Sequence, residues 1–105
     1  MRSRRTDTKH REVARAIELV CGAKKDLSAT GGGVGDFLAP MRPRSRPPFW
    51  LEVEVKTPRN KRGEATESQF TPAQREWRKK TKRFPRIVAT SAQDAERQLR
   101  EMMGI

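Results

Sequence analysis

The segment from Phe49 to Thr57 constrains the fold more than any other part of the chain, because apolar and charged side chains alternate along it. Successive side chains of a β-strand point to opposite faces, so this alternation predicts a strand with one apolar and one charged face. The apolar side chains are Leu51, Val53 and Val55, and the charged ones are Glu52, Glu54 and Lys56. We expect this segment to be the central strand of a small sheet that ends at Pro58.

The N-terminal part of the chain predicts a helix followed by two shorter strands. Between Thr8 and Cys21 apolar residues recur at helical spacing, and Gly22 is a natural helix end. This apolar stripe consists of Val13, Ala16, Ile17 and Val20. Residues 24–30 are ambiguous and compatible with a short edge strand, and residues 36–39 fit another strand after the glycine-rich segment 31–35. Residues 1–7 are polar and basic, and we expect them to form a flexible terminus.

The C-terminal part predicts a loop over residues 59–70, a helix, a strand and a last helix. Thr71, Pro72 and Gln74 are typical N-cap, N1 and N3 residues of a helix that continues to about residue 82. Residues 86–90 fit a strand, and Ser91 with Asp94 predicts the capped start of the final helix. The expected order is α-β-β-β-α-β-α. Residues 8–105 should therefore form one α/β domain, a small mixed β-sheet flanked by helices.

The charge of the chain indicates a polyanionic partner. There are 24 Lys and Arg residues against 13 Asp and Glu, which gives a net charge of +11. The alternative explanations are solubility or a disordered basic tail, although the periodic apolar segments argue against disorder of the whole chain.

Cys21 is the single cysteine, so the chain cannot form an internal disulfide and we expect a buried thiol in a reducing compartment. No apolar run approaches the ~20 residues that a membrane span needs, and no apolar signal core follows the basic N-terminus. We therefore expect a cytoplasmic protein.

The charged face of the central strand is a candidate metal-dependent hydrolytic site. Hydrolysis of a phosphodiester needs a polarised water, neutralisation of the charge that grows on phosphorus, and a stabilised leaving oxygen, and a hard divalent cation serves all three needs. Asp36 and Glu54 would supply carboxylate ligands to Mg²⁺ or Mn²⁺, and the Val55 carbonyl would add a third oxygen. Lys56 would neutralise charge, while Glu12 and Gln74 would hold or orient water or phosphate.

Each of these residues also has an ordinary structural explanation. Most Glu-x-Lys triplets on strands are solvated faces with incidental ion pairs, and an isolated Asp36 is more often a turn or cap residue. Gln74 is fully explained as half of a capping box, and Glu12 would pair with Lys9 or Arg15 on the helix surface. Their order along the chain, taken together, favours the functional interpretation.

Four segments in order resemble the PD-(D/E)XK nuclease superfamily and, more narrowly, the VRR-NUC (virus-type replication-repair nuclease) domain. These segments are Arg11-Glu12-Val13, Gly33-Val34-Gly35-Asp36-Phe37, Leu51-Glu52-Val53-Glu54-Val55-Lys56-Thr57 and Thr71-Pro72-Ala73-Gln74-Arg75-Glu76-Trp77. The resemblance departs from the family at Gly35, where a proline is usual. The proline-rich residues 41–48 also lengthen the gap between the two acids.

The resemblance implies a restriction-endonuclease-like fold and a Mg²⁺- or Mn²⁺-dependent DNA endonuclease. By this resemblance Asp36 and Glu54 are metal ligands, Lys56 is catalytic, and Glu12 and Gln74 support the metal and water. Stand-alone domains of this kind are typically viral or bacterial, which suggests a phage-infected or bacterial cell. Some resolve four-way (Holliday) junctions as homodimers in replication, recombination or DNA repair, so junction resolvase, flap nuclease and nonspecific nickase all remain open.

Basic residues cluster in the segments that flank the candidate site, where they would contact phosphate groups. The expected DNA-binding residues are Arg42, Arg44, Arg46, Arg59, Lys61, Arg62, Arg75, Arg78 and Lys79. Few aromatic residues are expected at the surface, since Trp77 fits core packing and only Trp50 is ambiguous. Recognition of duplex or branched DNA by backbone and shape is therefore favoured over base readout.

Two other functions are compatible with the sequence. A non-catalytic basic nucleic-acid-binding protein would bind DNA with strong salt dependence and cleave nothing. A small basic ribosomal or scaffold-like protein would prefer RNA. Neither function requires two acids and a lysine at one site, so the nuclease ranks first.

Overall fold

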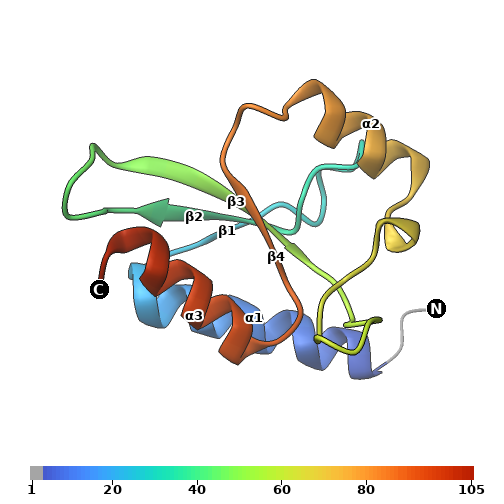
Figure 1. Cartoon of the computed structure of the whole chain (residues 1–105), viewed down its shortest axis with the longest axis horizontal. Helices are drawn as coiled ribbons and strands as arrows, with labels where there is room; N and C mark the ends of the chain where they lie inside the picture. The colour runs from blue at the N-terminus through green and yellow to red at the C-terminus, as the bar shows by residue number, and fades with distance from the viewer. Residues whose placement is uncertain (1–3) are drawn as a thin grey trace.

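The computed structural model describes residues 4–105, which form three α-helices, one short 3₁₀ helix and one sheet (Figure 1). In chain order the elements are α1 (Arg4–Cys21), β1 (Lys25–Asp26), β2 (Phe37–Met41), β3 (Phe49–Val55), η1 (Glu67–Gln69), α2 (Pro72–Lys80), β4 (Arg86–Ala89) and α3 (Ala92–Met103). The expected α/β order is confirmed. No helix within residues 4–105 has the length and apolar character needed to cross a membrane.

The sheet is mixed and has the strand order β1-β2-β3-β4. Strands β1, β2 and β3 pair antiparallel in turn, whereas β4 runs parallel to β3. A hairpin connects β2 to β3 directly, but the connection from β3 to β4 passes through η1 and α2, which is the longer crossover that parallel strands require. The strand predicted from Phe49 to Thr57 is the central β3, which ends at Val55.

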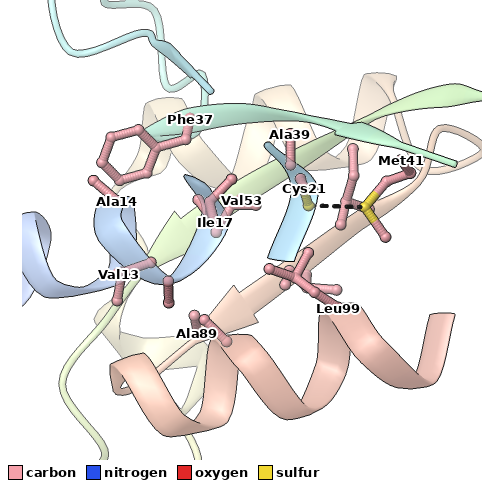
Figure 2. Close-up of a cluster of buried hydrophobic side chains, with 14 of the residues drawn as sticks. Val13, Ala14, Ile17, Cys21, Phe37, Ala39, Met41, Val53, Ala89 and Leu99 are labelled. Atoms are coloured by element: carbon pink, nitrogen blue, oxygen red, sulfur yellow. Dashed lines mark hydrogen bonds between the residues drawn. The ribbon is translucent and has the colours of Figure 1, made fainter. Parts of the chain in front are cut away.

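Helices α1 and α3 lie side by side and cover one face of the sheet, while α2 lies apart from them (Figure 1). The predicted stripe of α1 packs into this layer, with Val13 and Ile17 fully buried next to Val53 of β3 (Figure 2). Leu51, on the same apolar face of β3, is also fully buried. The charged face of β3 is thus turned away from the helical layer.

Cys21 is buried in this core, as expected, with its Sγ 3.8 Å from the Sδ of Met41 (Figure 2). Burial raises the pKa of the Cys21 thiol, which makes it a poor nucleophile.

The predicted start of the first helix is corrected, whereas the segment 24–30 does contain a short edge strand. Helix α1 begins at Arg4 rather than Thr8, because no glycine or proline interrupts the preceding residues and a polar helix surface needs no burial. Of the terminus predicted to be flexible, residues 1–3 lie outside the described residues. The ambiguous segment 24–30 contains only the two-residue strand β1 and then turns.

Candidate active site

Asp36 and the end of β3 meet because β2 and β3 are antiparallel. Phe37 pairs with Val53, so Asp36, just before β2, lies beside the last residues of β3. The Val55 N–H donates to Asp36 Oδ2 at 2.7 Å, and the Asp36 N–H donates to the Val53 carbonyl at 2.8 Å. The amide and carbonyl of one strand residue point to the same edge, so the Val55 carbonyl lies on the side of β3 that faces Asp36.

Glu54 is the buried acid of the cluster, with 8% of its surface exposed. Its Oε1 accepts a hydrogen bond of 2.8 Å from Gln74 Nε2 and lies 3.5 Å from Lys56 Nζ. Burial and the nearby Asp36 charge raise the pKa of Glu54 to about 7, against the opposing effect of Lys56. The ionised Glu54 carboxylate therefore destabilises the folded protein, and a bound cation would relieve this destabilisation.

Lys56 is fixed by three neighbours on the same side of the sheet. Its Nζ donates to Gln74 Oε1 at 3.0 Å and to the Gln69 carbonyl at 3.2 Å, and it lies 5.0 Å from the centre of the Phe70 ring. The ammonium is thus pre-positioned beside Glu54.

Gln74 satisfies both explanations that its sequence position allowed. It forms a capping box with Thr71, whose Oγ1 accepts from the Gln74 N–H at 3.1 Å and whose N–H donates to Gln74 Oε1 at 2.9 Å. The same side chain reaches Lys56 through its oxygen and Glu54 through its nitrogen. The first turn of α2 therefore holds the two charged groups of the site.

His10, which the sequence analysis did not select, takes the place expected for an acid of α1. His10 Nε2 lies 3.2 Å from Asp36 Oδ1, and the ring packs against Phe37 with centroids 4.5 Å apart. Residues 10, 13 and 17 recur at helical spacing, so extending the apolar stripe towards the N-terminus would have found His10.

The structure does not bring Glu12 to this site, which corrects the expectation. Glu12 is exposed and lines a separate hollow with Thr8, Arg11 and Arg15. One residue on an α-helix turns the side chain by about 100°, so the residue just before Val13 points away from the stripe that faces the sheet.

Glu52 joins three segments around the site. Its carboxylate accepts hydrogen bonds from the Gly35 N–H at 2.8 Å, from Trp77 Nε1 at 2.7 Å and from Arg86 Nε at 2.8 Å. Trp77 is half-buried through this contact, on the charged side of the sheet. The alternation of β3 placed Glu52 on the face of Glu54, but its partners come from distant segments that no local pattern reveals.

The glycine-rich segment approaches both β3 and α2 closely. A Cβ on Gly35 would lie 2.7 Å from the Cγ of Glu52, and a Cβ on Gly33 would overlap the Ala73 carbonyl at the start of α2. Gly33 also has a φ of +82°, which favours glycine. These glycines let the loop before Asp36 pack between the sheet and α2.

A hollow of about 410 Å³ opens at this end of the sheet. Asp36, Val55, Lys56 and Gln74 line it together with Lys9 and His10, whereas Glu54 lies deeper, bonded to Gln74. Among residues whose side chains the structure describes, no three His, Cys, Asp or Glu side chains converge as a metal site. The donors present are two carboxylates and a carbonyl, a set that suits Mg²⁺ or Mn²⁺ ions that retain several waters.

The basic loop after β2 lies at the far end of the hairpin, which corrects the expectation that it borders the site. Met41 pairs with Phe49, so Arg42, Arg44 and Arg46 are separated from Asp36 by the whole of β2. In an antiparallel hairpin the connecting loop is opposite the start of the first strand, and Arg42 is here about 20 Å from Asp36 at ~3.4 Å per residue. The Arg44 N–H instead donates to the Met103 carbonyl at 3.2 Å.

The remaining predicted DNA-binding residues are nearer the site. Arg59, Lys61 and Arg62 are exposed on the loop after β3, and Arg62 pairs with Glu64 at 3.2 Å. On α2, Arg75 and Lys79 are exposed, while Arg78 is half-buried, stacked 4.0 Å from the centre of the Phe70 ring.

Comparisons of the chain with protein-family models, with curated proteins and with solved structures gave no match. The functional conclusion therefore rests on the geometry of the site and on the resemblance of its motifs.

Proposed function

We propose that this chain is a divalent-metal-dependent DNA endonuclease of the PD-(D/E)XK type, related to VRR-NUC domains. The observation that carries the proposal is the convergence of Asp36, Glu54 and Lys56 at one end of the sheet, where Gln74 holds Glu54 and Lys56. A solvated strand face would not require a buried Glu54 whose pKa is raised to about 7. The mixed sheet with helices is compatible with a restriction-endonuclease-like fold.

Asp36, Glu54 and the Val55 carbonyl would hold the cation. When bound, Mg²⁺ or Mn²⁺ would supply positive charge and Lewis acidity next to the scissile phosphate. His10 holds one oxygen of Asp36, and the Val55 N–H holds the other, so this carboxylate is oriented before any ligand binds.

Lys56 neutralises the negative charge that develops on the phosphoryl oxygens. Its ammonium is a compact charge already fixed by Gln74 and the Gln69 carbonyl, so it needs little reorganisation during the reaction. Gln74 is a positioning residue in this mechanism. Exposed cations on the loop after β3 and on α2 would bind the phosphates on either side.

The substrate is proposed to be branched or four-way junction DNA in replication, recombination or repair, in the cytoplasm of a bacterial or phage-infected cell. A resolvase makes paired cuts and needs two active sites, so this form of the proposal requires a homodimer. Light scattering on the protein with and without junction DNA measures that state directly.

The test is a cleavage panel of duplex, flap, single-stranded and four-way junction DNA with Mg²⁺ or Mn²⁺. Wild type should cut and EDTA should stop it. Asp36→Asn, Glu54→Gln and Lys56→Ala should each lose at least ~100-fold in rate while binding DNA normally. Lys25→Ala, an exposed lysine of β1 outside the cluster and outside the expected DNA-binding residues, is the control. Equal cutting by wild type and the Lys56 variant would overturn the site assignment.

A readout independent of activity is metal-dependent stability. A cation that binds only the folded protein raises its melting temperature. Mg²⁺ or Mn²⁺ should therefore stabilise wild type more than Asp36→Asn, measured by thermal unfolding at constant ionic strength.

The net charge of +11 supports a second candidate, a non-catalytic DNA-binding protein. It would show salt-dependent binding without cleavage by any divalent ion, and no metal-dependent stabilisation.

A further inference from the structure

An aromatic side chain stands exposed among cations beside α2. Phe84, in the connection from α2 to β4, has 68% of its surface exposed. It lines a hollow together with five cations, Arg75, Arg78, Lys79, Lys82 and Arg86, and with one acid, Glu67. A large apolar side chain that is so exposed contributes little to packing. Most of the charged side chains around it are positive.

Three of these cations are free to bind a ligand. Arg75, Lys79 and Lys82 form no ion pair within 4.0 Å with any acid whose side chain the structure describes. Arg78 is partly engaged, 3.8 Å from Glu67 and stacked on Phe70. The hollow therefore presents uncompensated positive charge, which complements a phosphate backbone.

This hollow is connected to the candidate active site through α2 and β4. Arg78 and Arg86 line this hollow and also line a small cavity together with Glu54 and Gln74 of the site. Arg86 opens β4 and pairs with Glu52, which shares a strand face with Glu54.

A second exposed aromatic residue lies at the end of the β3–β4 pair at which Phe84 lies. Trp50 is 59% exposed and precedes Glu52 by two residues, so it shares the face of Glu52 and Glu54. Phe84 precedes Arg86, the partner of Glu52, by the same interval. Strand rise places Trp50 about 13 Å from Glu54, a span of a few nucleotides. Trp50, which the sequence left ambiguous, is therefore exposed, and Phe84 is an exposed aromatic residue that the sequence did not single out.

We propose that Phe84, within this basic hollow, stacks on an unpaired DNA base a few nucleotides away from the candidate active site. An aromatic face binds any base whose own face is free, whereas the bases of a continuous duplex are already stacked on each other. The cations bind the adjoining phosphates. This inference rests on the proposed function for its consequence, which is selection of substrates with an unpaired strand over blunt duplex.

The test is binding without metal, by fluorescence anisotropy in EDTA, so that no cleavage intervenes. The probes are a blunt duplex, the same duplex with a single-stranded overhang, and that overhang made of abasic nucleotides, which keeps the phosphates and removes the bases. Phe84→Leu removes the aromatic face and keeps apolar bulk, and Phe84→Trp keeps a stacking face. Leu19→Ala is the matched control, because Leu19 is 73% exposed on α1, away from this hollow.

We expect Phe84→Leu to weaken binding of the overhang about tenfold and to leave the blunt duplex unchanged. Phe84→Trp and Leu19→Ala should bind as wild type. For wild type, replacing the overhang by abasic nucleotides should weaken binding by the same factor. For Phe84→Leu, the same replacement should not weaken binding further. If Phe84→Leu weakened binding of all three probes equally, or weakened binding of none, the proposal would be overturned. A change in molecular mass by light scattering without a change in binding would also overturn it, because it would assign Phe84 to self-association.

The outcome separates this inference from the nuclease proposal. Lys56→Ala should retain the overhang preference, since Lys56 does not line the hollow of Phe84. A protein that cuts DNA but shows no effect of Phe84→Leu refutes the stacking site alone. A protein that shows the effect but never cuts refutes the nuclease alone.

Discussion

The buried Glu54 carboxylate lowers the free energy of unfolding of the protein at neutral pH. Its pKa rises from 4.5 to about 7 because the carboxyl is buried and lies near Asp36. Between these values the folded state binds more protons than the unfolded state, so the free energy of unfolding falls as pH rises. The cost is absent below pH 4.5 and complete above about pH 7.

Glu54→Gln should therefore stabilise the metal-free protein near pH 8 and have little effect near pH 4. At 1.36 kcal/mol for each pKa unit the gain is on the order of 3 kcal/mol. Urea unfolding across this range measures it. Glu76→Gln is the control, because Glu76 is exposed and pairs with the exposed Lys80 at 3.8 Å. A gain for Glu54→Gln that does not vary with pH would contradict the electrostatic explanation.

At the residue scale, the sequence predicted the pair of acids, the lysine and the glutamine, because β3 has strict alternation and α2 has a recognisable cap. It predicted Glu12 wrongly because several helix residues flank an apolar stripe. His10 was missed because a histidine at the end of an apolar helix stripe is ordinarily interpreted as a packing residue. The partners of Glu52 depend on tertiary contacts with Gly35 and Arg86 that no spacing in the chain reports.

Among the elements, α2 both folds locally and assembles the site, and two substitutions separate these roles. Thr71→Ala removes the cap hydroxyl and should cost about 1 kcal/mol in unfolding free energy. Gln74→Ala removes its half of the cap and also frees Lys56 and Glu54. Cleavage by the folded protein should fall much further in Gln74→Ala than in Thr71→Ala. Equal losses of activity would mean that only the cap matters.

The glycine-rich loop offers a comparison between backbone strain and steric overlap. Gly32 and Gly33 both have positive φ, at +69° and +82°, but only Gly33 has neighbours within 4 Å of an added Cβ. Gly32→Ala should cost about 1 kcal/mol through strain. Gly33→Ala should cost more, because its Cβ would displace the start of α2, and it should also impair cleavage. Urea unfolding of both variants checks the order; equal destabilisation would contradict the close approach.

The order of the elements was predictable because period-two and helical patterns are strong and the caps of α2 and α3 are explicit. The start of α1 was not, because polar residues at a helix end carry no periodic signal. The position of the Arg42–Arg46 loop followed from strand direction, which the expectation of a site-lining loop did not take into account.

At the scale of the whole molecule, positive charge lies both on the loop of the β2–β3 hairpin and on the loop after β3. Substituting Arg42, Arg44 and Arg46 by Ala should leave cleavage of a short DNA unchanged, because the loop begins about 20 Å from Asp36 at ~3.4 Å per residue. Affinity for long duplex should fall, and its salt dependence should weaken by up to about three counterions. Substituting Arg59 and Lys61 should affect both substrates. Loss of short-substrate cleavage in the hairpin variant would contradict this separation.

The Glu52 carboxylate carries a consequence for how relatives of this chain diverge. It satisfies a loop amide, an indole and a guanidinium from three segments at once. A change at any one of these positions leaves a buried polar group unpaired, which costs more than a surface change. Glu52, Trp77 and Arg86 should therefore covary as a set among homologues, with glycine retained at position 35, even where the active-site acids themselves are lost.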